Sequence, residues 1–276
     1  MTGPTLLVGC GKMGSALLDG WLERGLAEHQ IHVVETHKPT AEALRSQPRG
    51  AAPSVRVHSS ADAMGGQAPP DAVVFAVKPQ SLGGMIGDYR GFAGPDAVFL
   101  SIAAGKRLEF FEQNLGSQAA IVRAMPNTPA AIGRGISVAV ANQNVSAAQR
   151  ARCQSLLEAV GEVAWVDDEA LLDPVTAVSG SGPAYVFLLI ECLAEAGVAV
   201  GLEAGLSARL ALATVSGAGE LARLSGDAPD VLRQNVTSPG GTTEAAIGVL
   251  MAGEGMRPLL VRAVEAATAR SRELAG

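Results

Sequence analysis

The sequence has few of the side chains that donate protons strongly or stack on nucleic-acid bases. Its 276 residues include two Trp, two Tyr and six Phe, and the formal net charge is −6. No lysine follows Lys106, no histidine follows His58, and Tyr185 is the only tyrosine after Tyr89. Because a nucleic-acid-binding surface is usually basic or rich in aromatic side chains, we predict no nucleic-acid partner.

Cysteine is also scarce. Cys10, Cys153 and Cys192 are widely separated and lack the spacing of metal ligands, and the four histidines form no metal-binding pattern with carboxylates. We predict no metal, and we predict that the cysteines are buried free thiols.

Long apolar runs are missing too. The longest purely apolar stretch, Ala184–Ile190, is much shorter than the roughly 20 residues that cross a bilayer. The first residues lack the basic and apolar regions of a signal peptide. We therefore expect a cytoplasmic protein with no membrane partner.

The chain divides into two regions with different patterns of expected secondary structure. From Thr5 to about Val166, short β-rich runs alternate with segments of helical period, which is typical of an α/β fold with helices covering a mostly parallel sheet. We predict a doubly wound Rossmann-type dinucleotide-binding domain over residues 1–166. The strands are expected at residues 5–8, 31–35, 72–77, 98–102, 120–125, 136–141 and 163–166.

The second region, residues 167–276, is expected to be helical and is a predicted dimerisation and substrate domain. Ala-rich and Leu-rich helices are expected at residues 184–200, 207–224, 243–251 and 256–274. The segment Tyr185–Leu202 is apolar on nearly every face, so an isolated domain of this size could not bury it. We therefore predict a homodimer whose core contains these helices.

A glycine fingerprint follows the first expected strand. In the segment 9–14, Gly-Cys-Gly-Lys-Met-Gly, Gly9 permits a tight turn, Gly11 lets the backbone approach a pyrophosphate, and Gly14 lets helix and strand pack closely. Lys12 and Met13 begin the helix whose amides would face the phosphates. A purely structural turn is the alternative, but the strand before the motif and the helix after it favour dinucleotide binding.

The residue that ends the second strand bears on the choice of coenzyme. Glu35 would accept hydrogen bonds from a ribose 2′-hydroxyl, which favours NADH. Thr36, His37 and Lys38 follow it and could bind the 2′-phosphate of NADPH, although a solvated turn explains His37 and Lys38 equally well. The sequence alone does not decide between NADPH and NADH as the coenzyme.

Further motifs occur in a characteristic order along almost the whole chain. They are Phe-Ala-Val-Lys-Pro-Gln at 75–80, Ser-Ile-Ala-Ala-Gly at 101–105, Met-Pro-Asn-Thr-Pro-Ala at 125–130, Val-Ser-Gly-Ser-Gly-Pro-Ala-Tyr at 178–185, and Val-Thr-Ser-Pro-Gly-Gly-Thr-Thr at 236–243. Together with the fingerprint, these motifs in this order closely resemble those of pyrroline-5-carboxylate reductase.

The resemblance implies NAD(P)H-dependent reduction of 1-pyrroline-5-carboxylate to L-proline, the last step of proline biosynthesis. It also implies two interlocked subunits, often assembled into a ring of dimers such as a decamer. On the coenzyme side it implies contacts from Ala76, Val77, Lys78, Pro79, Ala103, Ala104 and Asn127. The family often has Asn-Arg after the second strand, where this chain has Glu35 and Thr36. Lys78 could alternatively do no more than bridge backbone carbonyls.

The loop before the third expected helix of the second region is the candidate substrate site. Unblocked amides from Gly240 to Thr243, with a Ser or Thr hydroxyl, could hold a carboxylate without any arginine, and Thr242 or Thr243 could cap the helix. The candidate substrate-binding residues are Ser238, Pro239, Gly240, Gly241 and Thr242. The motif alone would suggest an ordinary capped loop. The resemblance implies a substrate loop contributed across the dimer interface, in which Thr243 is the catalytic residue that hydrogen-bonds the ring nitrogen.

The shortage of strong acids agrees with an imine substrate. A carbonyl substrate would need a proton donor, whereas a protonated cyclic imine already accepts hydride at carbon. Tyr185 could donate a proton, but its apolar helix favours a core or interface role. The rival enzyme class, the β-hydroxyacid dehydrogenases, uses a helix-borne lysine that is missing after Lys106. A noncatalytic nucleotide sensor would have no need of the substrate loop.

Overall fold

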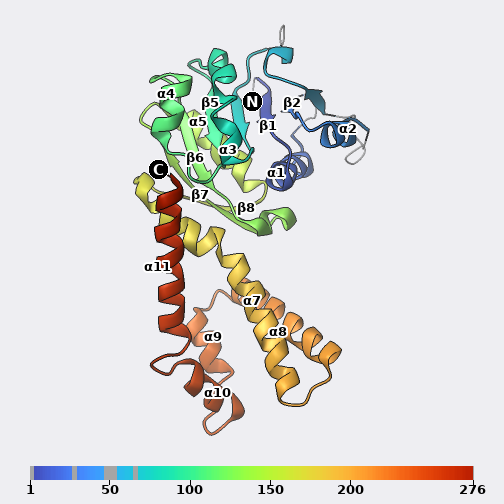
Figure 1. Ribbon diagram of the computed structural model, residues 1–276, viewed down its shortest axis with the longest axis vertical. Helices are drawn as coiled ribbons and strands as arrows, with labels where there is room; N and C mark the ends of the chain where they lie inside the picture. The colour runs from blue at the N-terminus through green and yellow to red at the C-terminus, as the bar shows by residue number, and fades with distance from the viewer. Residues whose placement is uncertain (1–2, 27–29, 47–54, 65–67, 276) are drawn as a thin grey trace. The chain divides into compact units, whose positions relative to one another are not determined.

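The chain is divided into two compact units in the computed structural model, which describes residues 3–26, 30–46, 55–64 and 68–275 (Figure 1). The first unit comprises residues 1–180 together with the end of the last helix from Thr268, and the second comprises Ser181–Ala267. The domain boundary expected after residue 166 stays a prediction. The compact units separate later, because Leu172 still packs against Val138 and Val140 of the sheet.

The first unit is built on an eight-stranded sheet in the order β3-β2-β1-β4-β5-β6-β7-β8. Neighbouring strands run parallel except β6 and β7, which are antiparallel. The predicted doubly wound, mostly parallel sheet is confirmed. The strands are β1 Thr5–Val8, β2 Ile31–Val34, β3 Arg56–His58, β4 Ala72–Phe75, β5 Val98–Ser101, β6 Ile121–Met125, β7 Gly135–Ala141 and β8 Gly161–Trp165.

Helices cover the sheet of the first unit, as expected for strands whose side chains are apolar in both directions. They are α1 Lys12–Glu23, α2 Lys38–Ser46, α3 Pro79–Leu82, α4 Leu108–Leu115, α5 Ala147–Glu158 and α6 Leu172–Val175. Short 3₁₀ turns cover Asp62–Met64, Ile86–Phe92, Thr128–Ile132 and Glu169–Leu171, and a π-helical turn covers Thr176–Gly180.

Helix α1 is fastened to the sheet by one apolar stripe. Leu17, Leu18 and Trp21 recur at helical spacing and are buried. The Trp21 indole Nε1 donates a hydrogen bond of 2.8 Å to the backbone oxygen of Leu156 in α5. This bond links the two helices and satisfies the polar group of a buried tryptophan.

The few aromatic side chains gather in a second apolar core. Phe75, Tyr89, Phe99 and Phe111 are all almost fully buried, and the ring of Phe75 contacts the other three. Burial raises the pKa of the Tyr89 phenol above its usual value of 10. These aromatics therefore build the sheet unit rather than a surface for ligands.

The second unit is helical, as predicted. Its helices are α7 Gly182–Ala199, α8 Ala204–Ser225, α9 Pro229–Asn235, α10 Thr242–Leu250 and α11 Met256–Ala275, whose last turns belong to the first unit. Helices α7 and α8 pack together, and the Ser207 hydroxyl donates to the Ala194 carbonyl at 2.6 Å. A Cβ on Gly197 would lie 2.1 Å from the Ser207 Oγ, so the small residue permits this approach.

Within a single chain, no residue of α7 is buried. Phe187 and Leu188 expose 58% and 57% of their surface, although both are strongly apolar. The prediction that all cysteines are buried is correct for Cys10 and Cys153 and wrong for Cys192, which lies exposed on this helix. Because the helix is apolar around its circumference, one chain cannot cover it alone.

Two histidines, one buried and one partly buried, form a pair at the β3 end of the sheet. His32 is 2% exposed, and its Nδ1 lies 2.9 Å from the Nε2 of His58. Burial, followed by the charges of His58 and Arg56, lowers the pKa of His32 from 6.5 to about 4. The unfolded chain thus protonates this imidazole at a higher pH than the folded chain. Stability rises with pH across this interval and is lost as pH falls through it.

This histidine makes a testable contribution to acid sensitivity. Replacing His32 with Gln should make the melting temperature fall less steeply than in the wild type between pH 6.5 and about 4. Thermal melts in buffers of equal ionic strength measure the slope. The control is His37→Gln, because His37 is exposed. Equal slopes for the wild type and His32→Gln would contradict the prediction.

Candidate functional site

The glycine fingerprint forms a tight turn between β1 and α1. Gly9 has a φ of +86°, which favours glycine, and its amide donates to the Val34 carbonyl of β2 at 2.9 Å. A Cβ on Gly14 would lie 2.4 Å from the backbone oxygen of Gly9. Gly11 has nothing within 4 Å of its Cβ position. The first and last glycines are thus required by packing, while Gly11 leaves open space where a phosphate could approach the backbone.

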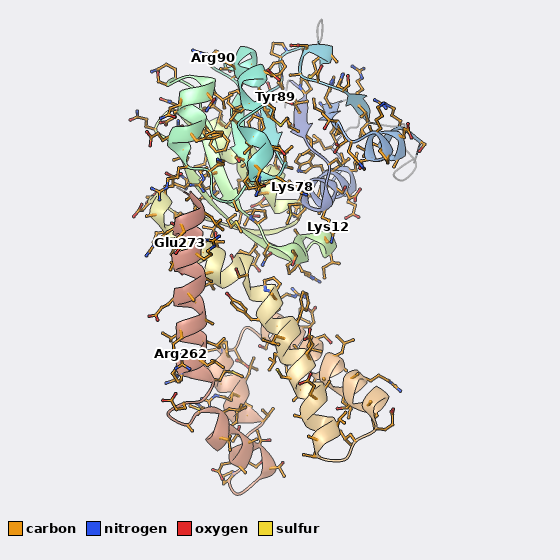
Figure 2. All side chains as sticks on the ribbon, viewed as in Figure 1. Lys12, Lys78, Tyr89, Arg90, Arg262 and Glu273 are labelled. Carbon is orange, nitrogen blue, oxygen red and sulfur yellow. The ribbon has the colours of Figure 1, made fainter. Side chains whose placement is uncertain are left out.

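Helix α1 begins directly after this turn, with Gly11 as its N-cap. Lys12 is exposed and Met13 is half-buried, and both are in the first helical turn, where amides have no partner within the helix. Lys78 follows the neighbouring parallel strand β4, so it lies at the same edge of the sheet as Lys12 (Figure 2). This edge therefore combines helix amides with two lysine side chains, which suits a pyrophosphate.

Glu35 links the turn after β1 to the turn after β2. One carboxylate oxygen accepts the Cys10 amide at 2.8 Å and the other accepts the His37 amide, also at 2.8 Å. Thr36, His37 and Lys38 are exposed, and the His37 ring nitrogen Nδ1 lies 2.8 Å from the Thr40 Oγ1. Glu35 is consequently held in place by two backbone hydrogen bonds at the edge where the fingerprint lies.

The remaining residues that are expected on the coenzyme side follow β4, β5 and β6. The Ala76 amide donates to the Val8 carbonyl at 2.8 Å, just beyond the β1–β4 pairing, and Val77 and Pro79 follow in the loop and at the start of α3. The Ala103 amide donates to the buried Ser101 hydroxyl at 3.2 Å, and Ala104 is exposed. These loops lie at the carboxyl edge of the sheet, where doubly wound folds bind ligands.

Asn127 has a structural partner that the sequence motif did not reveal. Its side-chain oxygen accepts the Ile136 amide at 2.9 Å, next to the start of β7. The contact holds the loop after β6 against the strand that returns antiparallel. A pocket-shaping role for Asn127 would therefore act through the position of this loop.

The substrate-loop candidate lies in the second unit and forms a turn before α10. Gly240 has a φ of +69°, and the Gly241 amide donates to the Ser238 carbonyl at 3.0 Å. The Gly240 amide donates to the Glu244 carboxylate at 2.7 Å. Two of the amides expected to bind a substrate carboxylate are therefore engaged within the chain, one by the Ser238 carbonyl and one by Glu244 of α10.

The cap of α10 also differs from the sequence-based expectation. Gly241, rather than Thr242 or Thr243, is the N-cap, and it makes no side-chain cap. Thr242 and Thr243 are the first two helical residues, so their amides have no partner within the helix. Thr243 is half-buried, whereas Ser238, Pro239 and Thr242 are exposed. Among the residues that the structure describes, no group of three His, Cys, Asp or Glu side chains could hold a metal.

Comparison with known proteins places both units in one family. The family model described as "Pyrroline-5-carboxylate reductase dimerisation" matches residues 169–274, and that described as "NADP oxidoreductase coenzyme F420-dependent" matches residues 5–105. A pyrroline-5-carboxylate reductase of Pseudomonas aeruginosa is 42% identical over 97% of this chain and 95% of its own length. One from Synechocystis sp. is 39% identical over 97% of both chains.

The chain belongs to the pyrroline-5-carboxylate reductase family. It acts as an NAD(P)H-dependent oxidoreductase of proline biosynthesis that reduces 1-pyrroline-5-carboxylate. A solved pyrroline-5-carboxylate reductase from Coxiella burnetii has a TM-score of 0.91 at 33% identity, with full coverage of both chains. The Plasmodium falciparum enzyme, solved with NADP bound, has a TM-score of 0.79 at 28% identity, covering 100% of this chain and 99% of that one.

Membership of the pyrroline-5-carboxylate reductase family explains the exposed apolar helices. The helical run Glu169–Ala199 is long and apolar enough to cross a membrane by length and composition alone. The same run lies within the dimerisation match. The predicted homodimer is thus supported, and the apolar face of α7 is the kind of surface that a partner subunit covers.

The tight packing of Gly14 makes a testable prediction about the coenzyme. Gly14→Ala should weaken coenzyme binding by at least about tenfold, because the new methyl group would push α1 away from Gly9 and move the first-turn amides. Fluorescence titration with NADPH and with NADH measures the dissociation constants. Gly83→Ala is the control, since its Cβ meets nothing within 4 Å. Undiminished affinity in Gly14→Ala would refute the assignment.

Proposed function

We propose that this chain reduces 1-pyrroline-5-carboxylate to L-proline by direct hydride transfer to a protonated imine, with alignment rather than a strong acid as the protein's main contribution. The strongest support is the match to pyrroline-5-carboxylate reductases over nearly the whole chain, including the loop at 238–243. The two units would act together as the family resemblance implies, with the loop of one subunit serving the coenzyme of another.

The proposed step balances without a proton donor. The substrate nitrogen enters protonated, so the carbon of the C=N⁺ bond is electron-poor. Hydride from the reduced nicotinamide forms the new C–H bond, the π electron pair moves to nitrogen, and the nicotinamide leaves oxidised. The product is the secondary amine L-proline. The protein needs to bring the two carbons to near contact and to exclude water.

The loop before α10 is proposed to hold the substrate. The amides of Gly240, Thr242 and Thr243 and the hydroxyl of Ser238 would bind the carboxylate at the positive end of the helix, while Pro239 and Gly241 shape the turn. Thr243 is the proposed catalytic residue. Its hydroxyl oxygen would accept the N–H of the protonated imine and so orient the ring.

The carboxyl edge of the first unit is proposed to hold the coenzyme. Gly9, Gly11, Lys12, Met13 and Gly14 would take the pyrophosphate. The nicotinamide half would lie against the loops that follow β4, β5 and β6. The proposed residues there are Ala76, Val77, Lys78, Pro79, Ala103, Ala104 and Asn127.

We propose NADH as the preferred coenzyme. Both oxygens of Glu35 are held by backbone amides, so the carboxylate cannot easily turn away from a neighbouring group. A fixed negative charge there would repel the 2′-phosphate of NADPH and accept hydrogen bonds from the 2′-hydroxyl of NADH. Thr36, His37 and Lys38 would then line a solvated turn next to the ribose.

The remaining proposals concern assembly and location. We propose a division into a dinucleotide-binding domain at 1–166 and a dimerisation and substrate domain at 167–276. We also propose that the dimers assemble into a ring such as a decamer, which light scattering would measure. We propose a cytoplasmic enzyme without nucleic-acid or membrane partners, and the overall negative charge argues against a nucleic-acid-binding surface.

One assay tests the reaction and the coenzyme together. The purified chain, incubated with 1-pyrroline-5-carboxylate and either coenzyme, should oxidise the coenzyme with stoichiometric formation of L-proline and a higher kcat/KM for NADH. If no proline forms, the proposed reaction is wrong.

Glu35→Gln should shift the NADH-to-NADPH ratio of kcat/KM toward NADPH by about tenfold, because a fixed charge is removed. Glu42→Gln, an exposed change on α2, is the control. An unchanged NADH-to-NADPH ratio in Glu35→Gln would contradict the proposed role of Glu35 in coenzyme preference.

Thr243→Ala should lower kcat by about one to two orders of magnitude, because a hydrogen bond that orients the imine is lost. Thr243→Ser keeps the hydroxyl and should retain most of the turnover. Steady-state kinetics at saturating coenzyme measure both variants, and coenzyme affinity should be unchanged. Wild-type turnover in Thr243→Ala would remove this residue from the mechanism.

A further inference from the structure

The Glu244 side chain lies where a ligand of the substrate loop is expected. Its carboxylate oxygen Oε2 accepts the Gly240 amide at 2.7 Å, and Glu244 itself is exposed at the third position of α10. A carboxylate on a loop amide at a helix N-terminus is the interaction by which the proposed site would bind the substrate carboxylate. The chain thus places one of its own acids on an amide of that site.

This contact differs from an ordinary capping box. In a capping box the acidic side chain at the third helical position bonds the amide of the N-cap residue, which here would be Gly241. The Gly241 amide instead donates to the Ser238 carbonyl, and Glu244 reaches one residue further to Gly240. The carboxylate therefore extends over the Gly-Gly turn instead of ending at the helix cap.

We propose that Glu244 is a specificity-determining residue that competes with the substrate carboxylate for the amides of the loop. The inference rests on the proposed function of this loop. In the free enzyme Glu244 holds the Gly240 amide, and the substrate displaces it or binds beside a like charge. Either event costs binding free energy for ligands that carry a carboxylate. Glu244 thereby raises the KM for the imine acid and weakens retention of the product, which carries the same carboxylate.

The chemistry of hydride transfer does not require Glu244. Its effect is on the binding of an anionic group, so it should appear in KM and in product inhibition, while kcat should change little. The affinity for a ligand that has no carboxylate should not depend on the charge of Glu244. Because Glu244 is exposed, added salt should weaken the effect. A purely structural cap would show none of these dependences.

The test compares Glu244→Gln with the wild-type enzyme. The KM for 1-pyrroline-5-carboxylate and the inhibition constant for L-proline should both fall by about three- to tenfold, with kcat within about twofold. The KM for 1-pyrroline, which lacks the carboxylate, should be unchanged, and 1 M NaCl should shrink the difference between the two proteins. Glu254→Gln removes an equal charge from an exposed position elsewhere in the second unit and should leave all constants unchanged.

Two outcomes would overturn the inference. An unchanged or higher KM for 1-pyrroline-5-carboxylate in Glu244→Gln would show that the contact only supports the loop. Equal effects on the KM for 1-pyrroline and on the KM for 1-pyrroline-5-carboxylate would show that Glu244 does not act on the substrate carboxylate. Failure of the proposed reaction appears differently, as a wild-type enzyme that forms no proline. Calorimetric titration of L-proline into both proteins then still decides whether removing Glu244 tightens carboxylate binding.

Discussion

The close approach of helix α1 to the turn after β1 is the constraint on which the coenzyme edge depends. No side chain can stand at Gly14, because the backbone oxygen of Gly9 lies 2.4 Å from where its Cβ would be. The buried apolar stripe of α1 and the Trp21 hydrogen bond to α5 hold the helix in this position. The first-turn amides are therefore fixed before any phosphate arrives, so binding need not order them.

Apolar side chains serve different purposes in the two units. In the first unit, the central strands and the aromatic cluster around Phe75 are buried within one chain. In the second unit, α7 remains exposed within one chain and lies in the region that matches the dimerisation family model. An amphipathic helix can be covered by its own sheet, but a helix that is apolar all round needs cover on several sides. Association of subunits thus completes the fold of this unit.

The anion sites proposed for this acidic chain rely on backbone amides more than on basic side chains. Two acidic residues occupy such amides: Glu35 bonds Cys10 in the fingerprint, and Glu244 bonds Gly240 in the second loop. Each contact holds a glycine-rich turn in shape, and each places a negative charge beside an expected ligand. The proposed sites would therefore link stability of the turn to selectivity for the ligand through the same carboxylates.

The sequence by itself determined the apolar strands, four helices of the second unit, the glycine turn and the family motifs, because these depend on local periodicity or on residues close in the chain. It did not predict β3, a three-residue strand with partly exposed side chains, or the seven-residue helix α9. The His32–His58 pair and the partner of Asn127 were also decided by tertiary structure. The exposure of Cys192 and the hold of Glu244 on Gly240 were likewise not foreseen. Short elements have too little periodicity to be recognised, and such contacts arise only when folding brings the groups together.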